Sequence, residues 1–150
     1  MTVDFELRRS PKLRVASIDY KGPWRENHLR PQFKELVNWA KENKVRTGNW
    51  IFRERGEKHH QACLVIKGPA HSAGKVKIRT IPAGWVAAVT FDPEAVSPRV
   101  VYHGLSDWIR WRKKDKTIKA VGATREVYAG DPWSDKKAWS RATVEFVVRK

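Results

Sequence analysis

The feature that most constrains the fold is that the sequence repeats itself. Four segments of the first half recur, in the same order, in the second half. The matching pairs are 15–20 with 86–91, 33–40 with 102–109, 48–57 with 122–131, and 63–66 with 144–147. The offsets of 71, 69, 74 and 81 residues drift slowly, as small insertions in surface loops would produce. We therefore expect two similar halves packed around a pseudo-twofold axis.

The first repeat shows the pattern of a strand, a helix and two further strands. Residues 15–20 are mostly apolar or β-branched, which favours a strand. Apolar residues then recur at helical spacing over 33–40, with Pro31 expected in the first turn of that helix. Strands are predicted at 49–53 and 61–66, joined by a turn.

The second repeat follows the same order. It predicts a strand at 85–91, a helix that starts at Ser97-Pro98 and carries apolar residues over 101–109, and strands at 117–128 and 142–148. Each helix should lie on one face of antiparallel strand pairs, which defines the α+β class.

Two short alternating segments, 5–8 and 76–79, predict one further strand before each repeat. The predicted fold is thus a duplicated strand-helix-strand-strand arrangement. It has two main helices, strands enough for two antiparallel sheets, and a central groove on the pseudo-twofold axis. We expect a single domain over 1–150, with repeats at about 3–68 and 74–150.

The composition favours a cytoplasmic protein that does not enter a membrane. No apolar run is long enough to span a bilayer, and the first residues do not resemble a signal peptide. Cys63 is the only cysteine and lies in an apolar run, which predicts an inert, packed thiol. His59 and His60 have no zinc-motif spacing to Cys63, so neither a metal nor a cofactor is predicted.

Positive charge and tryptophan content are both unusually high. The chain has 31 Lys and Arg residues against 16 Asp and Glu, a net charge of +15, and 8 Trp. Strong positive charge favours nucleic acid or acidic ligands as partners. Tryptophan supplies walls for an aromatic pocket, platforms for base stacking, or bulk for a core.

A groove between two similar halves is the expected place for a ligand. Strand alternation puts the Glu126 carboxylate on the groove side of the strand at 122–129, where the other half offers an aromatic ring. A carboxylate among aromatic rings favours an organic cation. The alternative is an exposed Glu126, or one paired with Arg53 or Arg125. The residues sharing this face are Thr124, Glu126 and Tyr128, with Trp50, Phe52 and Glu54 as their counterparts.

Several segments together resemble the GyrI-like domains. The strand and Gly-Pro-aromatic turn at 15–24, the Ile-Pro-Ala-Gly entry at 81–84 and the Glu-x-Tyr strand at 126–128 are similar to that family in order and spacing. So are the two helices with Trp39 and Trp108. The resemblance runs from about residue 3 to residue 149.

The resemblance implies a duplicated fold with a central ligand pocket. In multidrug-responsive regulators of the MerR and AraC types, such a domain is the effector-binding module, and the Glu of the Glu-x-Tyr strand contacts cationic aromatic drugs. Glu126 matches that position, Trp24 the aromatic residue after Gly-Pro, and Trp85 the residue after Ala-Gly. Strand alternation adds Tyr20, Trp50, Phe52 and Tyr128. No helix-turn-helix precedes residue 3, so a stand-alone member is expected.

Three functions stay open from the sequence. The first is binding of a small aromatic, cationic ligand by a sensor or sequestering module, with a separate DNA-binding protein as a potential partner. The second is an enzyme, a hydrolase of small electrophiles with Glu126 as general base; binding is favoured over catalysis. The third is nucleic-acid association through the basic, Trp-containing stretches 110–114 and 136–141.

Overall fold

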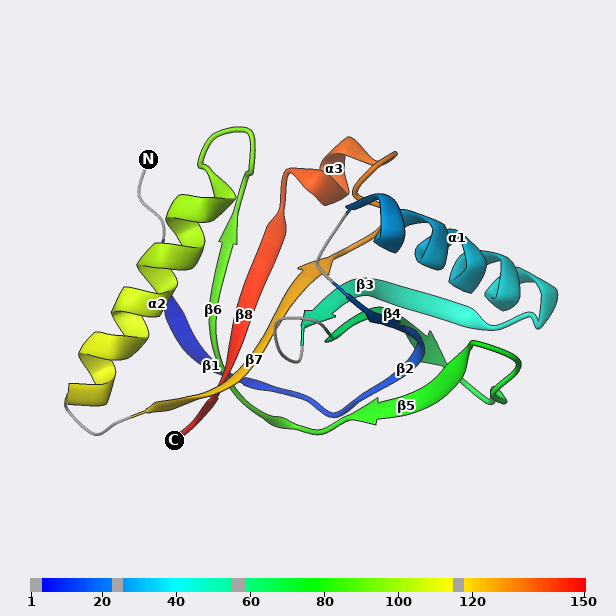
Figure 1. The fold of residues 1–150 in the computed structure, drawn as a ribbon, viewed down its shortest axis with the longest axis horizontal. Helices are drawn as coiled ribbons and strands as arrows, with labels where there is room; N and C mark the ends of the chain where they lie inside the picture. The colour runs from blue at the N-terminus through cyan, green and yellow to red at the C-terminus, as the bar shows by residue number, and fades with distance from the viewer. Residues whose placement is uncertain (1–3, 23–25, 55–58, 115–117) are drawn as a thin grey trace.

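A computed structural model of the chain describes residues 4–22, 26–54, 59–114 and 118–150. Eight antiparallel strands form one curled sheet, and two long helices and one short helix accompany it (Figure 1). The elements are β1 (Glu6–Ser10), β2 (Leu13–Lys21), α1 (Glu26–Glu42), β3 (Arg46–Glu54), β4 (His59–Lys67), β5 (Lys77–Ile81), β6 (Gly84–Phe91), α2 (Pro98–Lys114), β7 (Lys119–Tyr128), α3 (Lys136–Trp139) and β8 (Ala142–Arg149).

The strand order is β1-β6-β8-β7-β3-β4-β2-β5, and its two ends mirror each other. Strands β3, β4 and β2 belong to the first repeat, and β7, β8 and β6 hold the equivalent places in the second. The halves meet where β3 pairs with β7. The predicted duplicated α+β fold is confirmed, with the strands joined in one continuous sheet.

The outermost strands cross from one half to the other. Strand β1 precedes the first repeat but pairs with β6 of the second, and β5 pairs with β2 of the first. Pro11 and Pro82 follow β1 and β5. Proline fixes φ near −65°, whereas tight two-residue hairpins need positive φ at their first loop position. Because the chain cannot fold straight back there, each short strand continues onto the other half.

The register of the last strand corrects the alignment of the repeats. Val15 lies opposite Val65, and Val86, the counterpart of Val15, lies opposite Val147. The offset between β4 and β8 is therefore 82, and the predicted value of 81 is wrong. A slip of one residue reverses which face a side chain occupies, so the counterpart of Cys63 is Glu145 rather than Val144.

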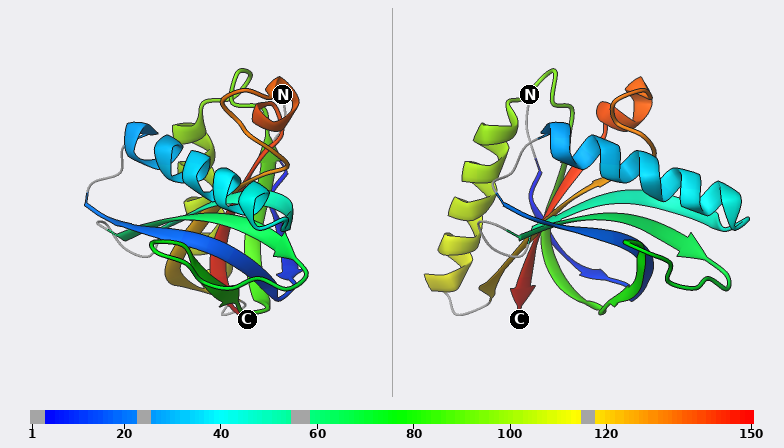
Figure 2. Two further views of the ribbon diagram at one scale, coloured as in Figure 1. Left: turned by 90° about the vertical axis from the view of Figure 1, so that its right-hand side faces the viewer. Right: turned by 45° about the vertical axis from the view of Figure 1, so that its right-hand side comes forward.

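Both long helices cover the same face of the sheet, each over its own half (Figure 2). Helix α1 packs through Phe33 and Leu36, and α2 through Val101 and Leu105. Trp50 and Phe52 contact both clusters, so the two helical cores join at the centre of the sheet. A separate cluster on the opposite face contains Val15, Ile51, Cys63 and Ile81.

The start of one helix differs from the prediction, and one short helix was not predicted. Helix α1 begins at Glu26, so Pro31 lies inside the helix and its prediction in the first turn is wrong. The missing N–H costs one backbone hydrogen bond near the N-terminus of the helix. Helix α3 was not predicted; it is a single turn whose N-cap, Asp135, accepts a hydrogen bond from the Lys137 amide at 3.0 Å.

Within the described residues, no helix is both long and apolar enough to cross a membrane. No group of three or more His, Cys, Asp or Glu side chains is placed to hold a metal ion in the same part of the chain. Cys63 is fully buried, and burial raises its thiol pKa to about 12. The thiol is therefore protonated and unreactive at neutral pH.

Candidate ligand-binding site

The centre of the site is the pair formed by Phe52 on β3 and Glu126 on β7. The two residues lie directly opposite each other in the sheet. They are also counterparts in the repeat, with an offset of 74. The pseudo-twofold axis therefore passes between them. At these two equivalent positions the first half has an aromatic ring and the second half has a carboxylate.

Two tyrosine hydroxyls hold the Glu126 carboxylate. Tyr102 donates from α2 to one oxygen at 2.6 Å, and Tyr128 donates to the other at 3.2 Å. Tyr128 shares the face of Glu126 because strand side chains alternate. Tyr102 reaches it because α2 packs across β7. The carboxylate is thus fixed in orientation by neutral donors.

The electrostatic surroundings do not favour the charged form of Glu126. Burial raises the pKa of its carboxyl, and the nearby Glu54 carboxylate adds to the rise, whereas the two tyrosine hydrogen bonds oppose it. Burial and the Glu126 charge also raise the pKa values of Tyr102 and Tyr128, which keeps both hydroxyls protonated as donors.

No Lys or Arg of the described segments forms an ion pair with Glu126. The predicted alternative of pairing with a neighbouring arginine does not hold for Arg125. That side chain lies on the opposite face, 2.7 Å from Glu145. Arg53 donates to Gln61 at 3.1 Å. Among the described residues, the hydrogen bonds to this partly buried carboxylate come from the two tyrosine hydroxyls.

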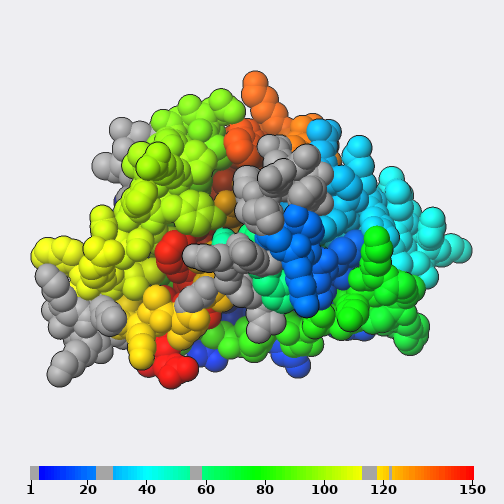
Figure 3. All heavy atoms as spheres, in the orientation of Figure 1, coloured from blue at the N-terminus to red at the C-terminus, as the bar shows by residue number. Residues whose placement is uncertain are grey.

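Two cavities meet at Phe52 and Glu126, both of which line each of them. The smaller, about 250 Å³, is lined by a majority of polar residues, and we call it the polar lobe. The larger, about 450 Å³, is mainly aromatic, and we call it the aromatic lobe. In the face of the molecule seen in Figure 3, α2 lies on the left and α1 on the right. The polar lobe includes Arg53, Glu54, His60, Gln61 and Thr124; the aromatic lobe includes Phe91, Tyr128, Trp133 and Trp139.

The aromatic lobe is built from rings in mutual contact. The Phe52 ring lies 5.4 Å from Trp133 and 5.3 Å from Tyr128, measured between ring centroids. Tyr128 in turn stacks on Trp139 at 6.2 Å. Such spacings are those of offset or tilted aromatic pairs. The lobe therefore presents ring faces and edges around one side of the Glu126 carboxylate.

The structure brings three of the predicted site residues together and leaves others apart. Phe52, Glu126 and Tyr128 line the aromatic lobe. Trp50 stacks on Phe33 with 4.7 Å between ring centroids and does not line either lobe. Tyr20 lies beside the cleft, with its ring 6.2 Å from that of His60.

Trp85 lies away from the cleft, at the start of β6. Lys150 sits 4.2 Å and Arg9 5.9 Å from its ring centre. Its place after Ala-Gly is at the entry to the strand, and the site lies beyond the other end of β6. Trp24 lies outside the described residues.

Sequence reasoning missed Tyr102, Trp133 and Trp139. Tyr102 was assigned to the apolar stripe of its helix, where it also belongs, because its ring packs against Phe146 at 5.8 Å. Trp133 and Trp139 come from the segment between β7 and β8. That segment has no matching length in the first repeat, since β3 and β4 are joined by four residues. The extra length was itself the available signal.

Known proteins resemble this chain in structure but not detectably in sequence. No protein-family model matches the sequence, and no curated protein matches it. Among solved structures, the C-terminal domain of EcmrR is similar over 100% of this chain and 99% of its own, at 18% identity with a TM-score of 0.72. SAV2435 bound to tetraphenylphosphonium covers 98% and 94% of the two chains, at 9% identity with a TM-score of 0.56.

A hydrolase encoded by lin2189 from Listeria innocua is also similar, over 97% of this chain and 92% of its own, at 10% identity with a TM-score of 0.63. Because each alignment covers nearly the whole of both chains, the similarity is one of the entire fold rather than of a local motif. The chain has the GyrI-like fold. Within this fold, the junction of β3 and β7 forms the floor of the cleft, and α1 and α2 flank it.

Proposed function

We propose that this protein binds a small aromatic organic cation in the cleft between its halves and acts as a sensor or sequestering module. The observation that carries the proposal is the Glu126 carboxylate. It is partly buried, accepts hydrogen bonds from two tyrosine hydroxyls, and lies at the junction of the two lobes. No Lys or Arg within the described residues forms an ion pair with it, and a cationic ligand would supply a counterion.

The aromatic lobe supports the choice of an aromatic ligand. Its rings can stack on a planar ligand and attract a cation by cation–π contact at the same time. Similarity to SAV2435, whose structure holds the aromatic cation tetraphenylphosphonium, supports the same ligand class. The two lobes together leave room for a ligand that extends to either side of Glu126.

The test compares two xanthene dyes of similar size and opposite charge. Rhodamine 6G is cationic and fluorescein is anionic, and the anisotropy of each dye reports its binding. We expect wild-type protein to prefer the cation despite its net charge of +15. Glu126→Gln should weaken rhodamine binding by about 1–3 kcal/mol, the scale of a lost hydrogen-bonded charge.

Glu35→Gln on the exposed side of α1 is the matched control, because it removes one carboxylate far from the floor of the cleft. It should leave both affinities unchanged. Equal affinity of the wild type for the two dyes, or unchanged rhodamine affinity in Glu126→Gln, would contradict the proposal.

Hydrolysis of a small electrophile is the second candidate, and it rests on the same carboxyl group. A pKa raised by burial suits a general base, and the two hydroxyls fix the direction of its lone pairs. The likeness to the Listeria hydrolase supports it. Product formation detected by mass spectrometry in wild type and absent in Glu126→Gln would favour catalysis over binding alone.

A further inference from the structure

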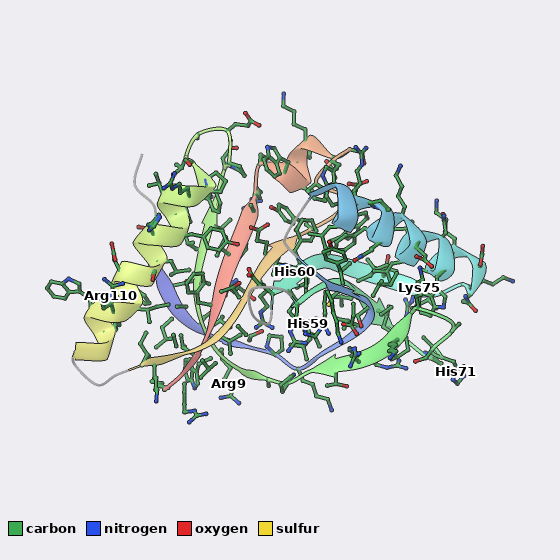
Figure 4. The ribbon with its side chains drawn as sticks, viewed as in Figure 1. Arg9, His59, His60, His71, Lys75 and Arg110 are labelled. Atoms are coloured by element: carbon green, nitrogen blue, oxygen red, sulfur yellow. The ribbon has the colours of Figure 1, made fainter. Side chains whose placement is uncertain are left out.

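One end of the molecule gathers positive charge and tryptophan. It lies where β1 and β8 end, β6 and β7 begin, and α2 ends (Figure 1). Figure 4 shows Arg9 and Arg110 on this side and His71 and Lys75 on the other. We call it the basic end, and define it by Arg9, Arg110, Arg112, Lys119, Arg149, Lys150, Trp85, Trp108 and Trp111.

Pairing and contacts connect these residues into one surface. Lys119 lies opposite Arg149 in the sheet, and Arg9 lies opposite Trp85. Lys150 also sits over the Trp85 ring. Figure 3 shows the end of β8, in red, beside the start of β7. The basic side chains therefore gather at one end of the sheet, as a pair on β7 and β8 and a group around Trp85.

One tryptophan at this end, Trp111, is unusually exposed, whereas Trp85 and Trp108 are partly buried against the core. Trp111 is 73% exposed, the largest value for a large hydrophobic residue among those described. Arg112 lies 4.5 Å from the ring centre of its neighbour Trp108. An exposed indole costs solvation free energy in a free protein, since its apolar surface faces water. A partner that stacks on the ring would recover that cost.

A cavity of about 320 Å³ opens within the basic end, between α2 and strands β7 and β8. Ile109 and Phe146 give it apolar walls, while Arg110 and Lys119 place cationic side chains in its lining. The combination suits a flat apolar group attached to an anion. Asp107, 3.8 Å from Arg110, is an acidic neighbour, but both side chains are more than two-thirds exposed and screened by water.

We propose that the basic end binds single-stranded nucleic acid. The phosphates would lie along Arg110, Lys119 and Arg149, one base would stack on Trp111, and another would enter the cavity beside Phe146. Counterion release from the phosphate backbone supplies most of the affinity. Stacking adds a contribution that does not depend on sequence.

Single strands fit this surface better than a duplex. In a duplex the faces of the bases are covered by their neighbours, so neither the Trp111 ring nor the cavity could reach them. The net charge of +15 attracts any polyanion to the molecule. The exposed ring of Trp111 would in addition favour a polyanion that carries bases over one that has none.

Fluorescence anisotropy of a labelled 20-nucleotide mixed-sequence DNA strand tests the proposal. Affinity should fall linearly on a logarithmic scale as salt rises, with a slope of roughly −0.7 for each phosphate contacted. The same strand in a duplex, and heparin as a polyanion without bases, are the comparison probes. We expect clearly tighter binding of the single strand than of either.

Substitutions separate stacking from charge. Trp111→Ala should weaken single-strand binding by about tenfold and leave heparin binding unchanged. Arg110→Ala with Lys119→Ala should weaken both. Lys75→Ala with Lys77→Ala removes two exposed charges at the opposite end and should change single-strand affinity much less.

Three results would overturn the proposal. One is no binding of the single strand at moderate salt. Another is equal binding of single strand, duplex and heparin. The third is equal loss in the variants at the two ends. Glu126→Gln should leave nucleic-acid binding intact, so this test stands or fails independently of the ligand proposed for the cleft.

Discussion

The two halves of the sheet share a backbone plan and differ in the chemistry they place on it. On the helix side, Phe52 of the first half stands where the second half has Glu126, and Phe33 stands where it has Tyr102. In the first half these positions form an aromatic contact at 4.9 Å. In the second half, the Tyr102 hydroxyl donates a hydrogen bond to the Glu126 carboxylate at 2.6 Å.

The opposite face shows the same contrast. Ile51, Cys63 and Ile81 pack as an apolar cluster in the first half. Their counterparts in the second half are Arg125, Glu145 and Ser10. The two charged side chains are only 4% and 10% exposed, with their Nε and Oε1 atoms 2.7 Å apart. Arg8 adds a second contact to Glu145 at 2.9 Å, and Arg125 donates to Ser10 at 3.1 Å.

The comparison shows that the duplicated backbone sets the direction of the side chain at each equivalent position, whereas the chemistry of that side chain differs between the halves. A symmetric backbone with identical residues would place two like groups across the axis. Here one half supplies rings and the other a carboxylate with its hydroxyl donors, so a single asymmetric site results. Two of the predictions below exchange residues between the halves to test this difference, and the others remove a group that only the second half has.

The largest effect is expected from breaking the buried ion pair of the second half. Glu145→Ala should lower the free energy of unfolding by about 3–5 kcal/mol, because it leaves the Arg125 charge buried without its carboxylate. Chemical denaturation measures this change.

The matched variant gives the second half the residues of the first: Ser10→Ile, Arg125→Ile and Glu145→Cys, in reducing buffer. Its stability should return to within about 1 kcal/mol of wild type, since apolar replacement of a buried ion pair is often neutral or stabilising. A triple variant as unstable as Glu145→Ala would show that the halves are not interchangeable at this face.

An intermediate effect is expected from Tyr102→Phe, which places at α2 the residue found in α1. It removes one hydrogen bond to the Glu126 carboxylate and should cost about 1.5–3 kcal/mol when that group is ionised. The cost should be smaller at low pH, where the carboxyl is neutral. The free energy of unfolding of both proteins, measured at pH 4 and pH 8, gives the cost of the substitution at each pH. An equal cost at both would mean that the lost hydrogen bond to Glu126 is not its cause.

The smallest effect is the pH dependence due to Glu126 itself. Burial raises its pKa in the folded protein above the usual 4.5, so the folded state holds this proton more tightly than the unfolded state. The stabilisation is full below pH 4.5 and is lost as pH rises through the folded-state pKa, at no more than about 1.4 kcal/mol per pH unit.

Glu126→Gln provides the reference for that measurement, because an amide has a similar shape and does not titrate. The difference in melting temperature between the two proteins should shift in favour of the variant as pH rises. Rhodamine 6G should reduce the shift in wild type only, since a bound cation favours the ionised carboxylate. A difference that does not vary with pH would mean that the pKa of Glu126 is not raised.

Much of this arrangement followed from local pattern. Strand alternation predicted that Glu126 and Tyr128 share a face, and helical spacing predicted the stripe containing Phe33 and Leu36. Both are properties of neighbours along the chain, so no knowledge of the fold was needed. The offset of 74 between β3 and β7 further identified Phe52 as the partner of Glu126 across the axis.

Contacts between distant segments could not be predicted in this way. The pairing of β1 with β6 and the register of β8 depend on packing across the sheet. Trp133 and Trp139 reach the cleft because the segment before β8 folds over it, and Trp85 misses the cleft because β6 enters the sheet at the other end. A motif match located Trp85 in sequence but carried no information about distance.

The sequence by itself determined the repeat, the α+β class and the faces on which its strand residues lie, because these depend on spacing along the chain. Only the tertiary structure decided which groups meet: the hydroxyl of Tyr102 on Glu126, the rings of the aromatic lobe, and the buried pair of Arg125 and Glu145. Those contacts are set by the crossing of elements remote in sequence, where a shift of one residue exchanges the two faces of a strand.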